Sequence, residues 1–105
     1  MDEDKRKRLE GASWRVGDAA DFLQLSEEEA AFVELKLALA VFLRDVRVKR
    51  GWTQAQVARR LGSSQSRVAK MESADATVTI DLLVKSLLAL GASRKDVGSV
   101  IARAA

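Results

Sequence analysis

The chain has 105 residues, with 18 Lys and Arg against 15 Asp and Glu, and it contains no Cys, His or Pro. The absence of Cys and His excludes disulfides, zinc-finger ligation and the usual nucleophilic and metal-dependent catalytic sets, so we expect neither an enzyme nor a cofactor. The length fits one domain, and 48% hydrophobic residues without proline or strand-like alternation predict an all-α fold.

Residues 1–17 are predicted to form a flexible charged segment, because charges of both signs crowd the first ten positions and cannot bury themselves. An alternative role for the basic run 5–8 is an arm that enters the DNA minor groove. No apolar stretch of the signal-peptide type follows the first residues, which predicts a cytoplasmic protein. Glu34 and Lys36 interrupt the longest apolar run, 30–43, so no membrane helix is expected.

Residues 18–50 are predicted to form a helical extension and a first long helix. A short helix is expected at 18–24, and Ser26 with Glu29 forms a capping box that starts a long helix running towards Lys49. One apolar stripe of that helix is expected to pack on the core; it comprises Phe32, Leu35, Leu39, Phe42, Leu43 and Val46. A second stripe lies on another face and comprises Val33, Leu37, Ala40 and Val41. Either the short helix, with Ala19, Phe22 and Leu23, or a second subunit would cover it.

Residues 51–105 begin with two short capped helices joined by a tight glycine turn. Thr53 is a predicted N-cap with Gln56 at the capping-box position, and Gly62 ends that helix, since glycine adopts positive φ without steric cost. Ser64 caps the second helix, 64–72, whose inner face carries Val68 with Met71. This is the pattern of a helix-turn-helix, although an ordinary helical hairpin would show similar caps.

The outward side chains of the second helix have the chemistry of base recognition. In the major groove glutamine can form a bidentate pair with adenine and arginine with guanine, so Gln65 and Arg67 are the candidate base-reading residues. The positive end of the dipole at each helix N-terminus can bind phosphate oxygens. Residues 44–70 hold eight basic residues against one acid, a net charge of +7. The predicted DNA-binding residues are Thr53, Gln54, Ser64, Gln65, Ser66, Arg67 and Lys70.

Two further helices are predicted after the loop 73–77. Thr79 caps a helix that ends at Gly91, and Ser93 with Asp96 forms a capping box for the last helix. Leu82, Leu88 and this last helix are further candidates for a dimer surface. Residues 51–105 are expected to pack with 18–50 as one domain, a compact bundle of five helices, or six with the short helix at 18–24.

The run from Thr53 to Glu72, with the segment that leads to Ser93, resembles the Xre/Cro/C1-type helix-turn-helix of phage repressors and bacterial regulators. The resemblance implies a lambda-repressor-like bundle in which Gln54 contacts phosphate and braces Gln65. Ser63 departs from the β-branched apolar residue usual in the turn, so that corner would be packed less tightly. Trp52 replaces the usual leucine, and its larger side chain is expected to pack in the core rather than to contact DNA.

We therefore expect a sequence-specific regulator of double-stranded DNA, a dimeric repressor or autoregulator that reads a palindromic operator. The resemblance to stand-alone HigA-like proteins implies an alternative, an antitoxin that neutralises a toxin protein and represses its own operon. A third possibility is a protein-interaction adaptor that keeps the fold but not DNA binding. In every case we expect a bacterial protein of the cytoplasm, associated with the nucleoid when bound to DNA, and no membrane partner.

Overall fold

The computed structural model describes residues 26–104, which hold five helices: α3 (Glu27–Lys49), α4 (Gln54–Leu61), α5 (Gln65–Glu72), α6 (Ile80–Ala89) and α7 (Arg94–Arg103). The chain divides into two units, residues 1–34 and 35–105. In the described part of the first unit the long helix begins where the capping box predicts, since Ser26 and Glu29 bond each other's backbone N–H groups. The charged segment 1–17, with its basic run 5–8, and the short helix predicted at 18–24 lie outside the described residues.

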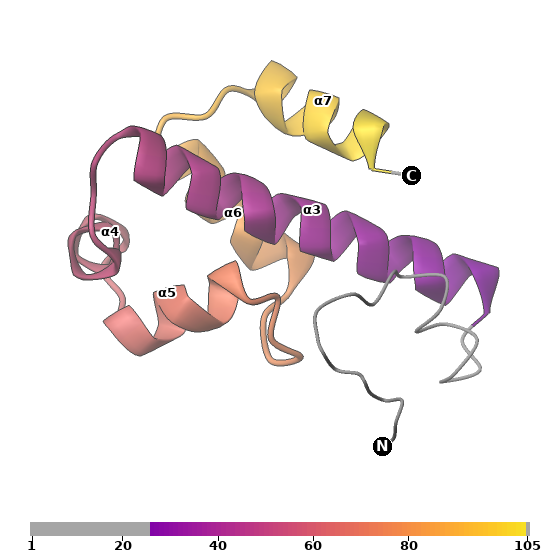
Figure 1. Cartoon of the computed structure of the whole chain (residues 1–105), viewed down its shortest axis with the longest axis horizontal. Coiled ribbons are helices and arrows are strands. Elements are labelled where there is room, and N and C mark those ends of the chain that lie inside the picture. The colour runs from indigo at the N-terminus through magenta and orange to yellow at the C-terminus, as the bar shows by residue number, and fades with distance from the viewer. Residues whose placement is uncertain (1–25, 105) are drawn as a thin grey trace. The chain divides into compact units, whose positions relative to one another are not determined.

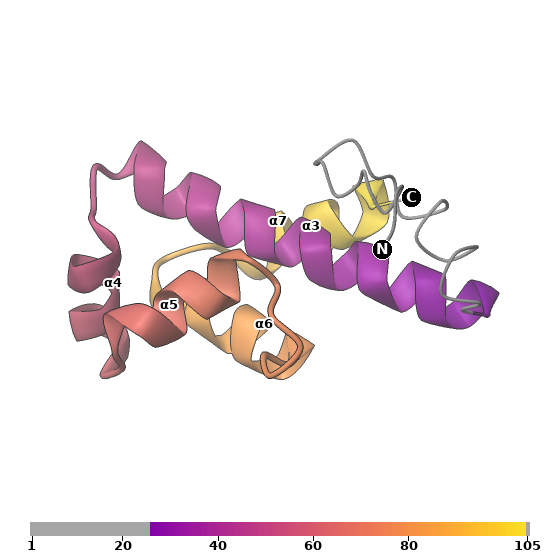
Figure 2. The ribbon, with the colours of Figure 1, turned by 60° about the horizontal axis from the view of Figure 1, so that its bottom comes forward.

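The second unit is built from the carboxyl-terminal part of α3 and from α4 to α7. α4 packs against α5 and α6, and α6 packs against α7. α5 and α7 lie on opposite sides of α3, as both views show (Figures 1 and 2). α4 is seen along its axis in Figure 1 while α5 lies across the view, so the two helices cross steeply, as in a helix-turn-helix.

Local capping chemistry explains where these helices begin and end. Thr53, Ser64, Thr79 and Ser93 each accept a hydrogen bond from the backbone N–H three residues on, as predicted. Gly62 ends α4 with φ of 64°, a left-handed conformation that glycine adopts without the Cβ clash of other residues. The predicted all-α fold with five helices is therefore confirmed for residues 26–104.

One core holds the second unit together. Each element of the unit except α7 contributes side chains that are fully or almost fully buried: Leu39, Leu43, Val57, Val68, Met71, Leu83 and Leu87. α7 adds Val97 and Val100, each 7% exposed. Burying a side chain of this size contributes about 1.5–3 kcal/mol, so these contacts fix the positions of the short helices α4 and α5, which are too short to be stable alone.

Two predictions for the stripes of α3 are wrong. Phe32 was expected in the core but is 53% exposed, because it belongs to the first unit and not to the unit that holds the core. Ala40 was expected on the outer stripe but is completely buried. Ala40 lies on the same side of α3 as Lys36, four positions before it, and Arg47, seven positions after it. Lys36 Nζ donates to the Asp75 carbonyl in the loop after α5, and Arg47 pairs with Glu72 of α5. Neighbouring segments therefore cover that side of α3. Val33, Leu37 and Val41 are exposed.

No helix within residues 26–104 is both long and apolar enough to cross a membrane.

The loop between α5 and α6 contains one residue in an unusual conformation. Ala74 has φ of 55°, the left-handed region that disfavours residues with a Cβ atom. Its backbone N–H donates to the Met71 carbonyl at 3.2 Å, and the chain turns there towards α6.

Candidate functional site

The candidate site begins at the amino terminus of α4. The Thr53 hydroxyl accepts from the Gln56 backbone N–H at 3.1 Å, and the Gln56 side chain accepts from the Thr53 backbone N–H at 2.8 Å. This reciprocal cap leaves the other N–H groups of the first turn free to bind a ligand. The positive end of the helix dipole is therefore presented at an exposed surface, where it attracts anions.

The amino terminus of α5 lies beside that of α4. Ser64 caps α5 by accepting from the Arg67 backbone N–H at 3.2 Å. Gln54 and Gln65 are the first residues of their helices, and Gln65 Nε2 donates to Gln54 Oε1 at 3.4 Å. Because this bond joins the first residues of both helices, two positive helix ends point at one region of the surface.

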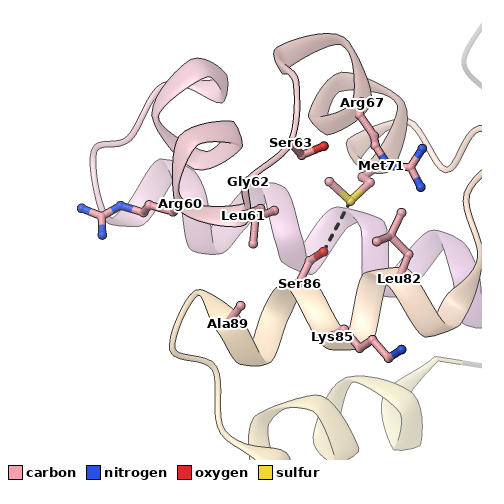
Figure 3. Close-up of a pocket in the computed structure, with 10 residues that line it drawn as sticks. All are labelled: Arg60, Leu61, Gly62, Ser63, Arg67, Met71, Leu82, Lys85, Ser86 and Ala89. Carbon is pink, nitrogen blue, oxygen red and sulfur yellow. Dashed lines mark hydrogen bonds between the residues drawn. The ribbon is translucent and has the colours of Figure 1, made fainter.

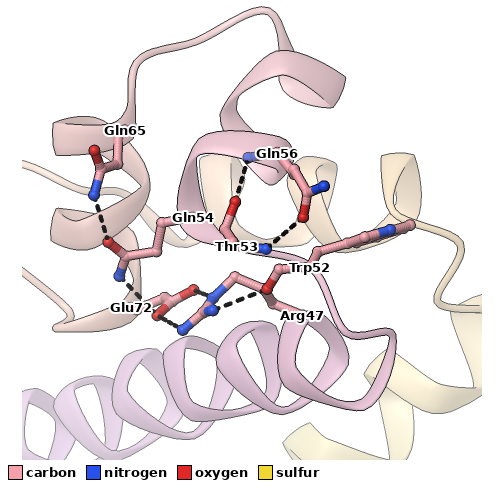
Figure 4. A network of polar contacts seen from close by, with 7 residues as sticks. All are labelled: Arg47, Trp52, Thr53, Gln54, Gln56, Gln65 and Glu72. Carbon is pink, nitrogen blue, oxygen red and sulfur yellow. Dashed lines mark hydrogen bonds and ion pairs between the residues drawn. The ribbon is translucent and has the colours of Figure 1, made fainter.

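A chain of polar contacts continues from Gln65 into the bundle, and Figure 4 shows it. Gln54 Nε2 donates to Glu72 Oε1 at 3.1 Å. Arg47 forms a bidentate ion pair with the Glu72 carboxylate, in which Nε is one donor and Nη2, at 3.1 Å, is the other. Arg47 Nη1 also donates to the Trp52 carbonyl at 3.1 Å. We call these four side chains, Arg47, Glu72, Gln54 and Gln65, the polar relay.

The ion pair of the polar relay is mostly buried, with the side chains of Arg47 and Glu72 only 16% and 6% exposed. The hydrogen bond to Glu72 raises the pKa of the Arg47 guanidinium above its usual range. Glu72 is at the carboxyl end of α5, where the helix dipole disfavours a carboxylate, so it needs a cation. Neither residue was among the predicted DNA-binding residues, although a glutamate in the last turn of a helix is a signal that such a cation partner exists.

The other predicted DNA-binding residues lie around the polar relay on different sides of α5. Ser66 and Lys70 are exposed and follow Gln65 round the outward face of the helix. Arg67 is two positions after Gln65, about 200° round an ideal helix, and its side chain runs beside Met71 towards α6 (Figure 3). On an ideal helix Ser66 lies about 100° from Gln65 and Lys70 about 60° from Arg67, so these exposed side chains spread round about half of α5, with Gln65 at one edge and Arg67 at the other.

Trp52 is partly buried and packs against the core, but guanidinium groups cover it on the outside. The Arg60 guanidinium lies 4.0 Å from the centre of the indole ring, and that of Arg50 lies 5.3 Å from it. Both distances are in the range of cation–π attraction. The prediction that Trp52 packs into the core is therefore only partly correct, because its indole ring also contacts two guanidinium groups at the surface.

This arrangement can bind an anionic, base-bearing polymer. Paired helix N-termini attract phosphate oxygens, and exposed amide, hydroxyl and ammonium groups beside them can pair with base edges. Residues 44–70 carry a net charge of +7, which would add affinity by displacing counterions from a polyanion.

Comparison with known proteins gives one match. A protein-family model described as helix-turn-helix matches residues 43–97, more than half of the chain. The matched range includes α4, α5, α6 and the cap of α7, and therefore every predicted DNA-binding residue. Neither curated proteins nor solved structures gave a match.

Proposed function

The chain belongs to the Xre/Cro/C1-type helix-turn-helix family of DNA-binding transcription regulators, and we propose that it is a dimeric repressor that reads a palindromic operator. In this proposal Thr53, Gln54 and Ser64 hold the phosphate backbone. Gln65 and Arg67 read base edges from α5, and Ser66 and Lys70 beside them contribute backbone or base contacts, with the Lys70 ammonium closest in chemistry to a phosphate contact. Binding alone would block transcription, so no covalent chemistry is involved.

The observation that carries the proposal is the polar relay. A free glutamine side chain samples many rotamers, and fixing it on DNA costs about 0.5–1.5 kcal/mol. The bonds from Gln65 to Gln54 and from Gln54 to Glu72 hold both amides in place before DNA arrives. Preorganised amides at the ends of two helices are useful for reading a rigid duplex and have no evident purpose in a plain helical hairpin.

Dimerisation through α3 is supported by an exposed apolar face in the second unit. Leu37, Val41 and Val48 recur at spacings of four and seven on the side of α3 opposite the core, and each is more than 40% exposed. Two copies that pair through this face would shield these side chains from water. A two-fold pair also presents two recognition helices to successive half-sites of a palindrome.

The experiment is a fluorescence-anisotropy titration of the protein with a duplex from the DNA upstream of its own coding sequence. A scrambled duplex of equal length and composition measures non-specific binding, and a salt series measures the electrostatic part. We expect Gln65→Ala to weaken binding to the upstream duplex by about 1–3 kcal/mol and to leave non-specific binding unchanged. Lys70→Ala should lower the salt slope by about one unit, whereas the matched variant Lys95→Ala on α7 should not.

The results of this titration distinguish sequence-specific DNA binding from non-specific binding and from an adaptor function. If neither duplex binds at low salt, DNA binding is refuted and an adaptor function replaces it. If both duplexes bind equally and Gln65→Ala changes neither, base reading from α5 is refuted. The dimer is tested by sedimentation equilibrium: Val41→Lys should give monomers, and Ile101→Lys, at an exposed apolar position on α7, should not.

A further inference from the structure

A cleft of about 390 Å³ opens between the α4–α5 turn and α6. We call it the turn cleft, and Figure 3 shows its lining side chains. Ser63 borders it on one side, Met71 and Leu82 supply apolar surface, and Ser86 of α6 lies at its floor. Sites for small ligands usually have volumes of about 300–1,000 Å³, so the cleft is large enough for a compact organic molecule.

A short polar side chain, Ser63, borders the cleft where the chain leaves α4. α4 ends with two backbone bonds, from Ser63 N–H to the Ala58 carbonyl at 2.8 Å and from Gly62 N–H to the Arg59 carbonyl at 3.2 Å. In helix ends of this type the residue after the glycine is frequently apolar and packs back on the helix. The short polar side chain of Ser63 cannot fill that space, and the region beneath the turn stays open.

A buried hydroxyl group lines the turn cleft. Ser86 is only 5% exposed, and its hydroxyl donates to Met71 Sδ at 3.6 Å. A thioether is a weak acceptor, and within residues 26–104 this is the one hydrogen bond that the Ser86 side chain makes. Buried polar groups normally have a stronger partner, so the hydroxyl is available to an oxygen atom of a ligand.

The charges around the turn cleft are positive. Arg67 of α5 lines it beside Met71, Lys85 of α6 lines it at the rim with its ammonium directed away from Met71 (Figure 3), and none of the acidic side chains within residues 26–104 lines it. Arg60 also borders the cleft, but its guanidinium stacks on Trp52 and points away (Figure 3). Two cations beside an apolar wall and a hydroxyl group suit a ligand with one carboxylate and a small apolar body.

We propose that the turn cleft binds a small organic carboxylate as an effector. Its carboxylate pairs with the Arg67 guanidinium while Lys85 adds a second positive charge at the rim, its apolar body contacts Met71 and Leu82, and one of its oxygens accepts a hydrogen bond from the Ser86 hydroxyl. Arg67 is shared with the proposed DNA contacts, so the ligand competes with DNA for this side chain. That coupling rests on the proposed function, whereas binding in the cleft does not.

The first test uses sodium benzoate as the probe and amide NMR spectra of the full chain at constant ionic strength. We expect saturable shifts centred on the amides of Ser63 and Ser86, with Kd on the order of 1–10 mM for a ligand of this size. Benzyl alcohol, which lacks the charge, and inorganic phosphate, which lacks the apolar body, should each bind at least five-fold more weakly. Shifts that do not saturate, or that are equal for phosphate and benzoate, refute the proposal.

Variants then locate the site. Ser63→Val should fill the cleft and weaken benzoate binding at least ten-fold, and Lys85→Gln should weaken it about five-fold. Lys95→Gln, an exposed lysine on α7, should leave it unchanged. Ser86→Ala provides a second test that barely alters the fold, with an expected loss of two- to ten-fold. Undiminished binding in both Ser63→Val and Ser86→Ala overturns the proposal.

The coupling is tested with the upstream duplex. Saturating benzoate should weaken DNA binding at least five-fold in the wild type and have no effect in Ser63→Val, and DNA should weaken benzoate binding by the same factor. Unchanged DNA affinity refutes the coupling. If the protein binds benzoate in the cleft but no DNA, the proposed function fails while the ligand site stands.

Discussion

Arg47→Met tests the central ion pair of the polar relay. It removes the cation but leaves an apolar side chain of similar length in its place. The Glu72 carboxylate then loses its bonds from Arg47 Nε and Nη2 and keeps that from Gln54 Nε2. A carboxylate that is 6% exposed cannot replace two charge-assisted bonds with water at low cost.

The magnitude follows from the burial of the two side chains. Removing one member of a buried ion pair usually costs about 3–5 kcal/mol. Because the Arg47 side chain keeps 16% of its exposure and so some solvent screening, we expect a cost at or just below the lower end of that range, about 2–3 kcal/mol. This is a large part of the roughly 5–15 kcal/mol that stabilises a small domain, so urea unfolding followed by circular dichroism will measure it readily.

The double variant Arg47→Met/Glu72→Met is the control. It removes both charges, and such replacements are often neutral, so we expect stability within about 1.5 kcal/mol of the wild type. It should nevertheless weaken specific DNA binding, since Gln54 loses its acceptor at Glu72 and no longer holds Gln65 in place. If Arg47→Met costs less than about 1 kcal/mol, or if the double variant is as unstable as the sum of the single ones, the ion pair is not the coupled unit inferred from the structure.

Three further predictions concern the fold. Ala74→Gly should raise the free energy of unfolding by about 0.5–1 kcal/mol, measured by urea denaturation, because glycine relieves the left-handed strain at φ of 55°; a destabilised variant would contradict this. Val68→Ala should cost about 2 kcal/mol in the same assay, since Val68 is fully buried, and a loss below about 0.5 kcal/mol would place it outside the core. The Ser93 backbone N–H lowers the pKa of Asp96, so this carboxylate stabilises the fold above the unfolded-state pKa, and the effect is lost as pH falls through the lower folded-state pKa. Asp96→Asn should therefore be less stable than the wild type at pH 7 and equally stable near pH 2, and an equal difference at both pH values would refute the role of charge.

Local patterns in the sequence determined the secondary structure of the described residues. Thr53, Ser64, Thr79 and Ser93 begin helices because a side-chain oxygen satisfies a backbone N–H three residues away, and no distant residue takes part. Gly62 ends α4 for an equally local reason, its freedom to take positive φ. The helix-turn-helix, and with it the family, was therefore readable from the sequence.

Long-range contacts decided the arrangement of the functional side chains. Arg47 and Glu72 are 25 positions apart, and their pairing depends on where α5 lies against α3, which no local pattern encodes. The same packing buries Ala40 against expectation, and Arg67 lies on the flank of α5 near α6. Helical spacing gives the relative angles of side chains on one helix, but only the neighbouring helices decide which of those angles face protein and which face solvent.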